Sequence, residues 1–216
     1  MILGSYLIGC MNPAYLMAKL KGYDIRQKGS GNAGASNALI LFGKLRGVIC
    51  AVADIGKAVV AVCLMGYFFE KLPLVYPLSA TACILGHIFP FYMGFRGGKG
   101  LACLAGVILC YDWKFFLLAL AVEIVVALVT DYICFVPLTA AVAFPICYIF
   151  MKKDIWGTLT LLIASAVMIY RHTENLKRIK SGAELRLSYL WKKEQEIERL
   201  RENTGKSEKD YFIDPQ

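Results

Sequence analysis

Three polar, glycine-containing clusters are the parts of this sequence that could do chemistry. They are KGSGNAGASN at 28–37, GHIFPFYMGFRGGKG at 86–100 and RHTENLKRIKSGAE at 171–184. The chain has two histidines, His87 and His172, and each lies in one of these clusters. Glycine-rich turns expose backbone N–H groups that can surround phosphate oxygens. GSGN adds a hydroxyl and an amide and GGKG adds an ammonium, so the clusters indicate a site for one or two phosphate groups.

Two better-known phosphate motifs do not fit these glycines. The run from Gly29 to Gly34 has the spacing of a dinucleotide-binding turn, with Asp54 twenty residues further on. That turn requires a preceding strand, but here polar residues precede the glycines and Asp54 lies in an apolar run. FRGGKG is not a Walker loop, because Gly100 follows Lys99 where Ser or Thr is needed.

The elements that must position these clusters are strongly apolar. Hydrophobic residues make up 58% of the 216 residues, against roughly 45–50% in soluble domains, and the mean hydropathy is +0.56. This composition excludes a disordered chain and a basic nucleic-acid-binding domain, although the net charge is +8. The eight cysteines form no C-x-x-C pair and no cluster with histidine, so we expect neither a disulfide framework nor a metal site. The expected fold is an all-α, polytopic integral membrane protein.

Seven apolar runs are candidate membrane spans. A spanning helix needs about 20 residues, and five of the runs can reach that length. A helix over 101–111 would cover about half of the hydrocarbon core. We therefore expect about seven transmembrane helices, with five as the alternative. The runs are 1–18, 47–69, 74–93, 101–111, 114–130, 132–151 and 155–170.

The positive charges predict the orientation and the domain organisation. Nineteen Lys and Arg residues lie on the side of the three clusters and four on the other side, with Lys57 inside a span. The positive-inside rule then places the N-terminus outside and the clusters and the C-terminus in the cytoplasm. We assign 1–184 to a membrane domain and 185–216 to a charged cytoplasmic tail that forms a solvated or interfacial helix.

Two charged residues, Asp54 and Lys57, stand one helical turn apart inside the second span. Charges are costly in lipid, so they either form a structural ion pair or face a watery cavity. The sequence leaves both interpretations open.

The three clusters resemble the bacterial acyl-phosphate:glycerol-3-phosphate acyltransferases, the PlsY family. The family patterns GSGNxGATNxxR, GHxFPxxxxFKGGKGxA and HxxNIxRLxxGxE correspond here to GSGNAGASNALI, GHIFPFYMGFRGGKGLA and HTENLKRIKSGAE. The shorter patterns DIR and D-x-x-K are present at 24–26 and 54–57. The resemblance covers about residues 1–186.

The resemblance implies a seven-helix enzyme of the bacterial inner membrane with its active site on the cytoplasmic face. The enzyme would transfer an acyl chain from acyl phosphate to the sn-1 hydroxyl of glycerol 3-phosphate, giving lysophosphatidic acid and phosphate. It would need no coenzyme A, metal or other cofactor. Its partners would be the two substrates, membrane lipid and a soluble enzyme that makes acyl phosphate, but not nucleic acid.

The motifs also assign roles to residues. Ser30, His172 and Asn175 would be catalytic, with His172 and Asn175 orienting the acceptor hydroxyl. Phosphate and substrate would be bound by Gly31, Asn32, Asn37, Gly97, Gly98, Lys99 and Gly100. The structural residues would be Glu184, Asp54, Lys57 and His87.

One position departs from the family pattern. The first pattern ends in Arg, and this chain has Ile40 there, which removes a bidentate clamp for phosphate. Lys44, one helical turn further on, and Arg46 are the expected replacements, and we include Lys44 among the substrate-binding residues. Two alternatives follow: a weakened or repurposed relative, or a small transporter or anion-sensing module. A transporter would usually show broken helices and repeated halves, and no such halves are evident.

Overall fold

The structure is a computed structural model, and it describes residues 1–205. Within this range every regular element is a helix. The 3-10 turns are η1 (Ile25–Gln27), η2 (Phe91–Met93) and η3 (Leu187–Leu190). The α-helices are α1 (Ile2–Cys10), α2 (Pro13–Leu20), α3 (Ala35–Phe42), α4 (Lys44–Phe68), α5 (Val75–Ile88), α6 (Leu101–Tyr111), α7 (Trp113–Thr130), α8 (Phe135–Lys152), α9 (Ile155–Lys180) and α10 (Lys193–Thr204).

Five helical segments of the described chain are long and apolar enough to cross a membrane. They are α4, α5 together with η2, α7, α8 and α9. The protein is therefore an all-helical, multi-pass integral membrane protein. Helix α6 is apolar but has 11 residues, and α1 has nine. Seven spans would require both of these short helices to cross as well.

The first apolar run is not one helix, which corrects the expected span over 1–18. The chain leaves helix at Met11 and restarts at Pro13. Asn12 caps the second helix, because its side-chain oxygen accepts a hydrogen bond from the Tyr15 backbone N–H at 2.8 Å. Proline at the first helical position lacks the N–H that a continuous helix would need, so the Asn-Pro pair begins a new helix.

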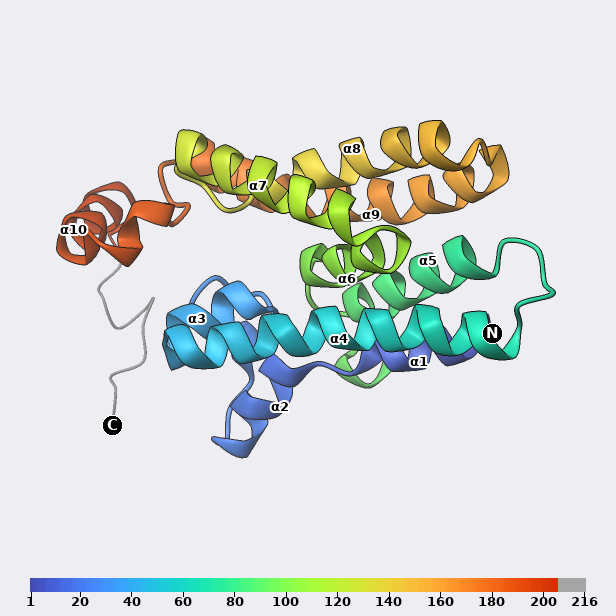
Figure 1. The fold of residues 1–216 in the computed structure, drawn as a ribbon. Coiled ribbons are helices and arrows are strands. Elements are labelled where there is room, and N and C mark those ends of the chain that lie inside the picture. The colour runs from blue at the N-terminus through green and yellow to red at the C-terminus, as the bar shows by residue number, and fades with distance from the viewer. Residues whose placement is uncertain (206–216) are drawn as a thin grey trace.

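The helices are arranged in three groups. Helices α7, α8 and α9 lie together on one side, α1 to α4 lie on the other, and α5 and α6 lie between them (Figure 1). At the centre of this bundle, large apolar side chains such as Ile84, Leu104 and Phe144 pack together with small buried ones. The small side chains on α4, α5, α8 and α9 let these helices approach closely. They include Ala58, Ala61, Ala80, Cys83, Ala141 and Ala164.

The contact between α1 and α5 depends on two glycines. A Cβ at Gly9 would lie 2.1 Å from the Cys83 carbonyl oxygen, and a Cβ at Gly86 would lie 2.1 Å from the Tyr6 carbonyl oxygen. Any larger residue would force the helices apart. Because α5 ends at the second polar cluster, this contact fixes the position of that cluster along the bundle axis.

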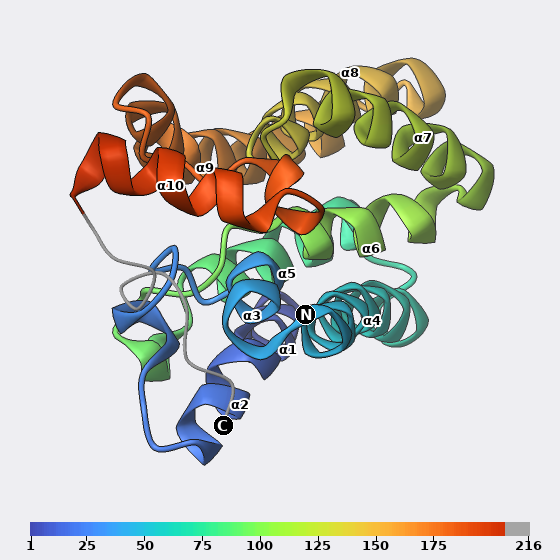
Figure 2. The same ribbon diagram turned by 90° about the vertical axis from the view of Figure 1, so that its left-hand side faces the viewer.

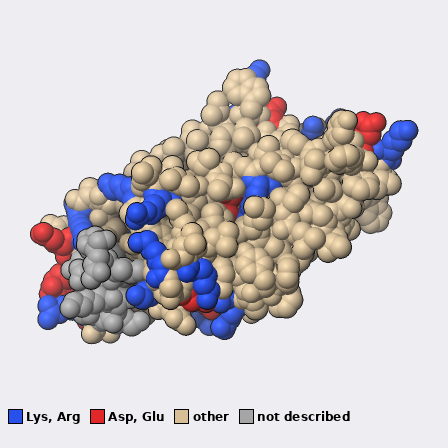
Figure 3. Space-filling view, turned by 90° about the horizontal axis from the view of Figure 1, so that it is seen from below, with Lys and Arg blue, Asp and Glu red and all other residues tan. Residues whose placement is uncertain are grey.

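The two ends of the bundle differ in charge. The N-terminus lies at one end and α10 at the other (Figure 1). Seen from that second end, α10 lies across α9, with α3 below it (Figure 2). Most of the Lys and Arg side chains on the lower face gather toward this end, and other residues cover most of the remaining surface (Figure 3).

The tail helix is packed rather than fully solvated. On α10, Leu200 is 1% exposed and Glu196 is 4% exposed. The part of the expected tail at 206–216 lies outside the described residues.

Candidate active site

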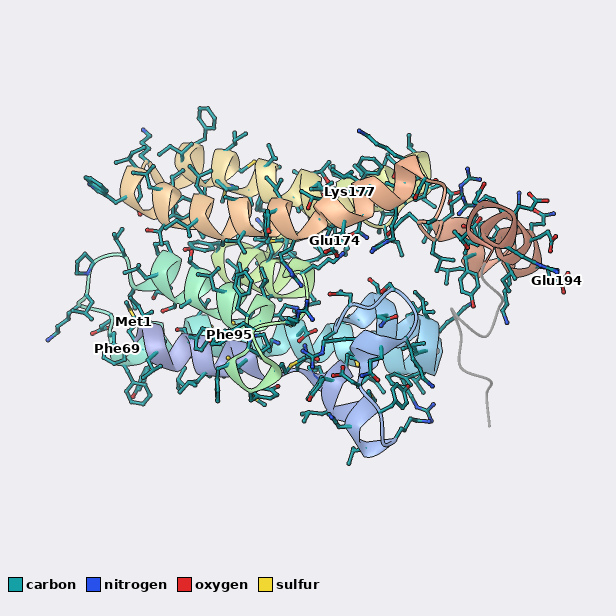
Figure 4. The ribbon with its side chains drawn as sticks, turned by 180° about the vertical axis from the view of Figure 1, so that it is seen from behind. Met1, Phe69, Phe95, Glu174, Lys177 and Glu194 are labelled. Carbon is teal, nitrogen blue, oxygen red and sulfur yellow. The ribbon has the colours of Figure 1, made fainter. Side chains whose placement is uncertain are left out.

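A single cavity of about 750 Å³ brings the three polar clusters together. Ser30, Asn32 and Lys99 line it from the first two clusters, and His172 and Asn175 line it from α9. In Figure 4, Glu174 and Lys177 lie between the end that carries Met1 and the end that carries Glu194, and they belong to α9, the helix of His172 and Asn175.

The loop of the first cluster is held by one buried amide. The Asn37 side-chain oxygen accepts from the Ser30 N–H at 2.9 Å, and its NH₂ group donates to the carbonyls of Ile25 and Lys28 at 3.0 and 3.1 Å. Gly29 has φ +60°, and a Cβ there would lie 2.2 Å from the Asn37 oxygen. Asn37 is fully buried and does not line the cavity. Its hydrogen bonds shape the loop, and its contact with phosphate stays a prediction.

The backbone donors of this cluster also differ from the expected GSGN site. The Ser30 N–H donates to Asn37 and the Gly31 N–H donates to the Lys28 carbonyl at 3.1 Å. Both are used to close the loop. The first N–H groups of a helix have no partner inside the helix, and Gly34, Ala35 and Ser36, at the start of α3, line the cavity. The backbone N–H groups that could face an anion in the cavity are therefore those at the start of α3, four residues further along the chain than the expected ones.

Two glycines of the second cluster, Gly97 and Gly98, use their backbone N–H groups to bond to the end of α5. The Gly97 N–H donates to the Ile88 carbonyl at 2.9 Å, and the Gly98 N–H donates to the His87 carbonyl at 3.1 Å. A Cβ on Gly98 would lie 2.0 Å from His87 Nε2. Both glycines are buried away from the cavity. Lys99 and Gly100, which follow them, do line the cavity.

His87 belongs to a buried polar network with the charged pair in α4. Lys57 Nζ lies 2.6 Å from Asp54 Oδ1 and 2.9 Å from His87 Nδ1, and it also donates to the Met11 carbonyl. All three side chains are at most 7% exposed. Asp54 and Lys57 therefore form a buried ion pair, and of the two only Asp54 lines the cavity, as His87 also does. The network connects α4, the α1–α2 break and the backbone that carries Lys99.

The same network contains a possible metal ligand set, formed by Asp54, His87 and Cys103, whose donor atoms lie within 4.8 Å of one another. The Lys57 ammonium lies against two of these donors, Asp54 and His87. An ammonium there repels a metal cation and already neutralises the carboxylate. The donor set therefore has the chemistry of an ion pair, and it does not fit a metal ion.

Lys99 is the central cation of the cavity. Its ammonium donates to the Asn175 side-chain oxygen, and the Asn175 NH₂ group donates to Glu184 Oε1 at 2.6 Å. Glu184 Oε2 accepts from Arg178 Nε at 2.6 Å. Asn175 and Glu184 thus hold Lys99 and Arg178 in place. Burial, and next the positive charge of Arg178, lower the pKa of Lys99 to about 8.

His172 presents one ring nitrogen to a ligand. Its Nδ1 lies 2.7 Å from the Met168 carbonyl oxygen. A carbonyl only accepts, so Nδ1 carries the proton and Nε2 remains an acceptor. His172 is 3% exposed and lines the cavity. The histidine is therefore held in the tautomer that can accept a hydroxyl proton.

Sequence reasoning missed Ser36 and Arg178. Ser36 is exposed to the cavity in the first turn of α3. Arg178 Nη2 is buried and has no hydrogen-bond partner in the described chain, and Arg178 lines the cavity. The position of Arg178 in the sequence could have revealed it, because it lies one turn after Asn175 on the same face of the helix.

The expected replacements for the missing arginine do not lie at the cavity. Ile40 does line it, but Lys44 and Arg46 are exposed and do not. The Arg46 guanidinium donates to the Phe42 carbonyl at 3.4 Å. Gly43 is the reason: it ends α3 and begins α4 at φ +86°, so positions 40 and 44 are not successive turns of one helix.

The remainder of the cavity is mainly apolar, although Glu123 of α7 also lines it. It continues from Lys99 between α4, α6, α7 and α8, where it is lined mainly by aliphatic and aromatic side chains. Representative members are Ile55, Leu104, Ile108, Leu120 and Val136. Within the described chain the cavity therefore joins a cationic chamber to an apolar arm.

Known proteins with similar sequences are glycerol-3-phosphate acyltransferases. The family model described as glycerol-3-phosphate acyltransferase matches residues 1–182. The chain is 34% identical to the glycerol-3-phosphate acyltransferase of Lactiplantibacillus plantarum over 202 residues, which cover 92% of this chain and 97% of the relative. It is 36% identical over 198 residues to glycerol-3-phosphate acyltransferase 1 of Oceanobacillus iheyensis, covering 87% and 94%.

Two solved structures share the fold. Both are crystal structures of PlsY, described as an integral membrane glycerol 3-phosphate acyltransferase. The glycerol 3-phosphate form has a TM-score of 0.80 and 30% identity, covering 88% of this chain and 94% of that one. The lysophosphatidic acid form has a TM-score of 0.76 and 30% identity, covering 86% and 92%. With the matched family model and these relatives, the chain belongs to the glycerol-3-phosphate acyltransferase family.

Proposed function

We propose that this membrane glycerol-3-phosphate acyltransferase uses acyl phosphate as its donor. It transfers the acyl chain to the sn-1 hydroxyl of glycerol 3-phosphate and releases lysophosphatidic acid and phosphate. The observation that carries the proposal is the single cavity, in which a chamber with Lys99 and Arg178 opens into an apolar arm. The chamber suits phosphate groups and the arm suits an acyl chain. Relatives crystallised with glycerol 3-phosphate and with lysophosphatidic acid support the acceptor and the product.

Two sets of groups hold the substrates. Lys99 binds the phosphate of glycerol 3-phosphate as a point charge, and Arg178 Nη2 donates to a phosphate oxygen. The first turn of α3, with the hydroxyls of Ser30 and Ser36, binds the phosphate of the donor. Holding both substrates in one chamber makes the reaction effectively unimolecular.

The chemical step is a direct transfer. The acceptor hydroxyl oxygen attacks the acyl carbonyl carbon, and the bond from that carbon to the phosphate oxygen breaks. His172 Nε2 takes the hydroxyl proton and returns it to the departing phosphate, so the enzyme is unchanged at the end. Phosphate is a good leaving group, so positioning and charge stabilisation suffice and no acyl-enzyme intermediate is formed.

We also propose that the N-terminus faces outward and that the chamber opens to the cytoplasm of a bacterial cell. The excess of Lys and Arg toward the α10 end supports this orientation. Glycerol 3-phosphate then enters from the cytoplasm and the acyl chain from the membrane. A soluble enzyme that makes acyl phosphate would supply the donor at the same face.

The test is acyl transfer by the purified protein in detergent. Palmitoyl phosphate and glycerol 3-phosphate should give lysophosphatidic acid and phosphate in equal amounts, and palmitoyl coenzyme A should not replace the donor. Activity with coenzyme A thioester alone would overturn the proposed donor. No acyl transfer from either donor would leave a repurposed relative as the better account.

A further inference from the structure

The segment that follows the family match forms part of the cavity. The match ends at residue 182, and residues from the next twenty also line the cavity, among them Leu185, Arg186, Leu187 and Leu190. These residues combine three aliphatic side chains with one guanidinium. A wall of this kind suits an amphiphile that carries a phosphate next to an alkyl chain.

This segment is held against the bundle by specific contacts at Asp131, in the loop between α7 and α8. The Leu187 N–H donates to the Asp131 carbonyl at 2.7 Å. The Ser188 N–H and hydroxyl donate to the two Asp131 carboxylate oxygens at 2.7 and 2.8 Å. Asp131 itself has φ +58°, a left-handed conformation that turns its carboxylate toward η3.

Helix α10 fixes the other side of the segment. Glu196 Oε1 accepts from the Arg186 N–H at 2.8 Å. Arg199 is paired with Glu196 at 2.5 Å and donates to the carbonyls of Gly182 and Glu184 at 2.7 and 2.8 Å. The wall is therefore part of the folded structure, and its position relative to the end of α9 is set by hydrogen bonds.

Arg186 differs from the other arginines of the cavity. Arg26 is paired with Asp24 and Arg178 with Glu184, each at 2.6 Å. In the described chain Arg186 has no carboxylate within ion-pair distance. Its guanidinium lies over the Tyr132 ring, 5.9 Å from the centroid, and Nε donates weakly to the Tyr132 hydroxyl at 3.4 Å. The remaining donors of the guanidinium are available to an anion.

We propose that residues 185–190, held in place by Asp131 and α10, form a wall over the acyl donor and that Arg186 binds the donor's phosphate. Arg186 thereby replaces the guanidinium that this chain lacks at Ile40, a second cavity-lining position. The apolar side chains beside it contact the first carbons of the acyl chain. This inference rests on the proposed function, because that function supplies the donor.

The kinetic test compares Arg186→Ala with Arg201→Ala, which removes an exposed arginine of α10 that does not line the cavity. Arg186→Ala should raise KM for palmitoyl phosphate by about 10- to 100-fold, with KM for glycerol 3-phosphate changed less than twofold. Arg201→Ala should change neither. Adding Ile40→Arg to Arg186→Ala should restore the donor KM, which a merely structural loss would not allow.

A binding test separates this inference from the proposed reaction. Dodecyl phosphate should raise the Tm of the native protein more than inorganic phosphate does, because its alkyl chain also contacts the apolar side chains of the wall. Arg186→Ala should reduce the Tm shift produced by dodecyl phosphate, and Arg201→Ala should not. This result in a protein without transferase activity would refute the proposed function and keep the site. An unchanged donor KM in Arg186→Ala, a change in KM for glycerol 3-phosphate instead, or no rescue by Ile40→Arg would overturn the inference.

Discussion

At the scale of single residues, the chemistry depends on how few groups in the chamber remain free. Asn175 is bonded to Lys99 and Glu184, and Asn37 is bonded inside its loop. Near α9 the groups left for substrate include Lys99, with donors beyond its bond to Asn175, Nη2 of Arg178 and Nε2 of His172. Lys99 is unusual among them, because its pKa of about 8 places its titration within the working pH range.

The lowered pKa of Lys99 predicts a pH dependence of acceptor binding. As pH rises through about 8, the free enzyme loses the ammonium charge, while the glycerol 3-phosphate phosphate stays dianionic above about pH 6. KM for glycerol 3-phosphate should therefore rise, approaching about tenfold per pH unit above the pKa. Initial rates between pH 6.5 and 9.5 at saturating donor measure this.

The matched control is Lys99→Arg. A guanidinium keeps its charge throughout this range, so the alkaline rise in KM should disappear, whatever the absolute KM becomes. A rise of the same size in Lys99→Arg would show that another group titrates.

At the scale of elements, the second cluster acts as a rigid support for Lys99. Gly97 and Gly98 bond to the last carbonyls of α5, and His87 packs on Gly98 and joins the Asp54–Lys57 pair. The glycines allow the close approach to His87. A change at Gly98 should therefore affect the whole protein and not only KM.

Gly98→Ala should destabilise the protein and abolish activity, because the added Cβ would lie 2.0 Å from a buried imidazole nitrogen. A clash of this kind costs about 1–3 kcal/mol, which should appear as a lower Tm in detergent. Gly56→Ala is the control, since a Cβ there meets nothing within 4 Å. A Gly98→Ala protein with native Tm and a raised KM alone would restore the phosphate-binding role.

The sequence predicts the helices and their bounds better than it predicts which polar groups bind substrate and which hold the structure. Apolar runs located α4, α7 and α8 to within three residues at each end. Hydropathy alone merged α1 with α2, because it does not register the break that Asn12 and Pro13 impose on the helix. Motifs located the chamber, yet they could not distinguish a residue that binds substrate from one that shapes the loop. Asn37 and Gly98 are examples, because their role depends on contacts between segments far apart in the chain.

The replacement for the arginine missing at Ile40 could not be found by spacing. Lys44 would share its face only if α3 and α4 were one helix, and Gly43 separates them. Arg186 lies 146 positions beyond Ile40 in the sequence. Only the folded tail brings both to one cavity.

At the scale of the whole molecule, the charge asymmetry predicts orientation. Ser181 ends α9 at an exposed position near the α10 end. In a cysteine-free variant, Ser181→Cys should react with a membrane-impermeant maleimide only after the cells are opened. Glu70→Cys, in the exposed loop between α4 and α5, should react from outside. Labelling of Ser181→Cys in intact cells would invert the proposed topology.

The central claim is that one chamber holds both substrates and that the acyl group moves directly between them. Initial rates over a matrix of palmitoyl phosphate and glycerol 3-phosphate concentrations test it most directly. Direct transfer predicts intersecting double-reciprocal lines and no phosphate release in the absence of glycerol 3-phosphate. Parallel lines, with a burst of phosphate equal to the enzyme concentration when the acceptor is absent, would reveal an acyl-enzyme and contradict the account.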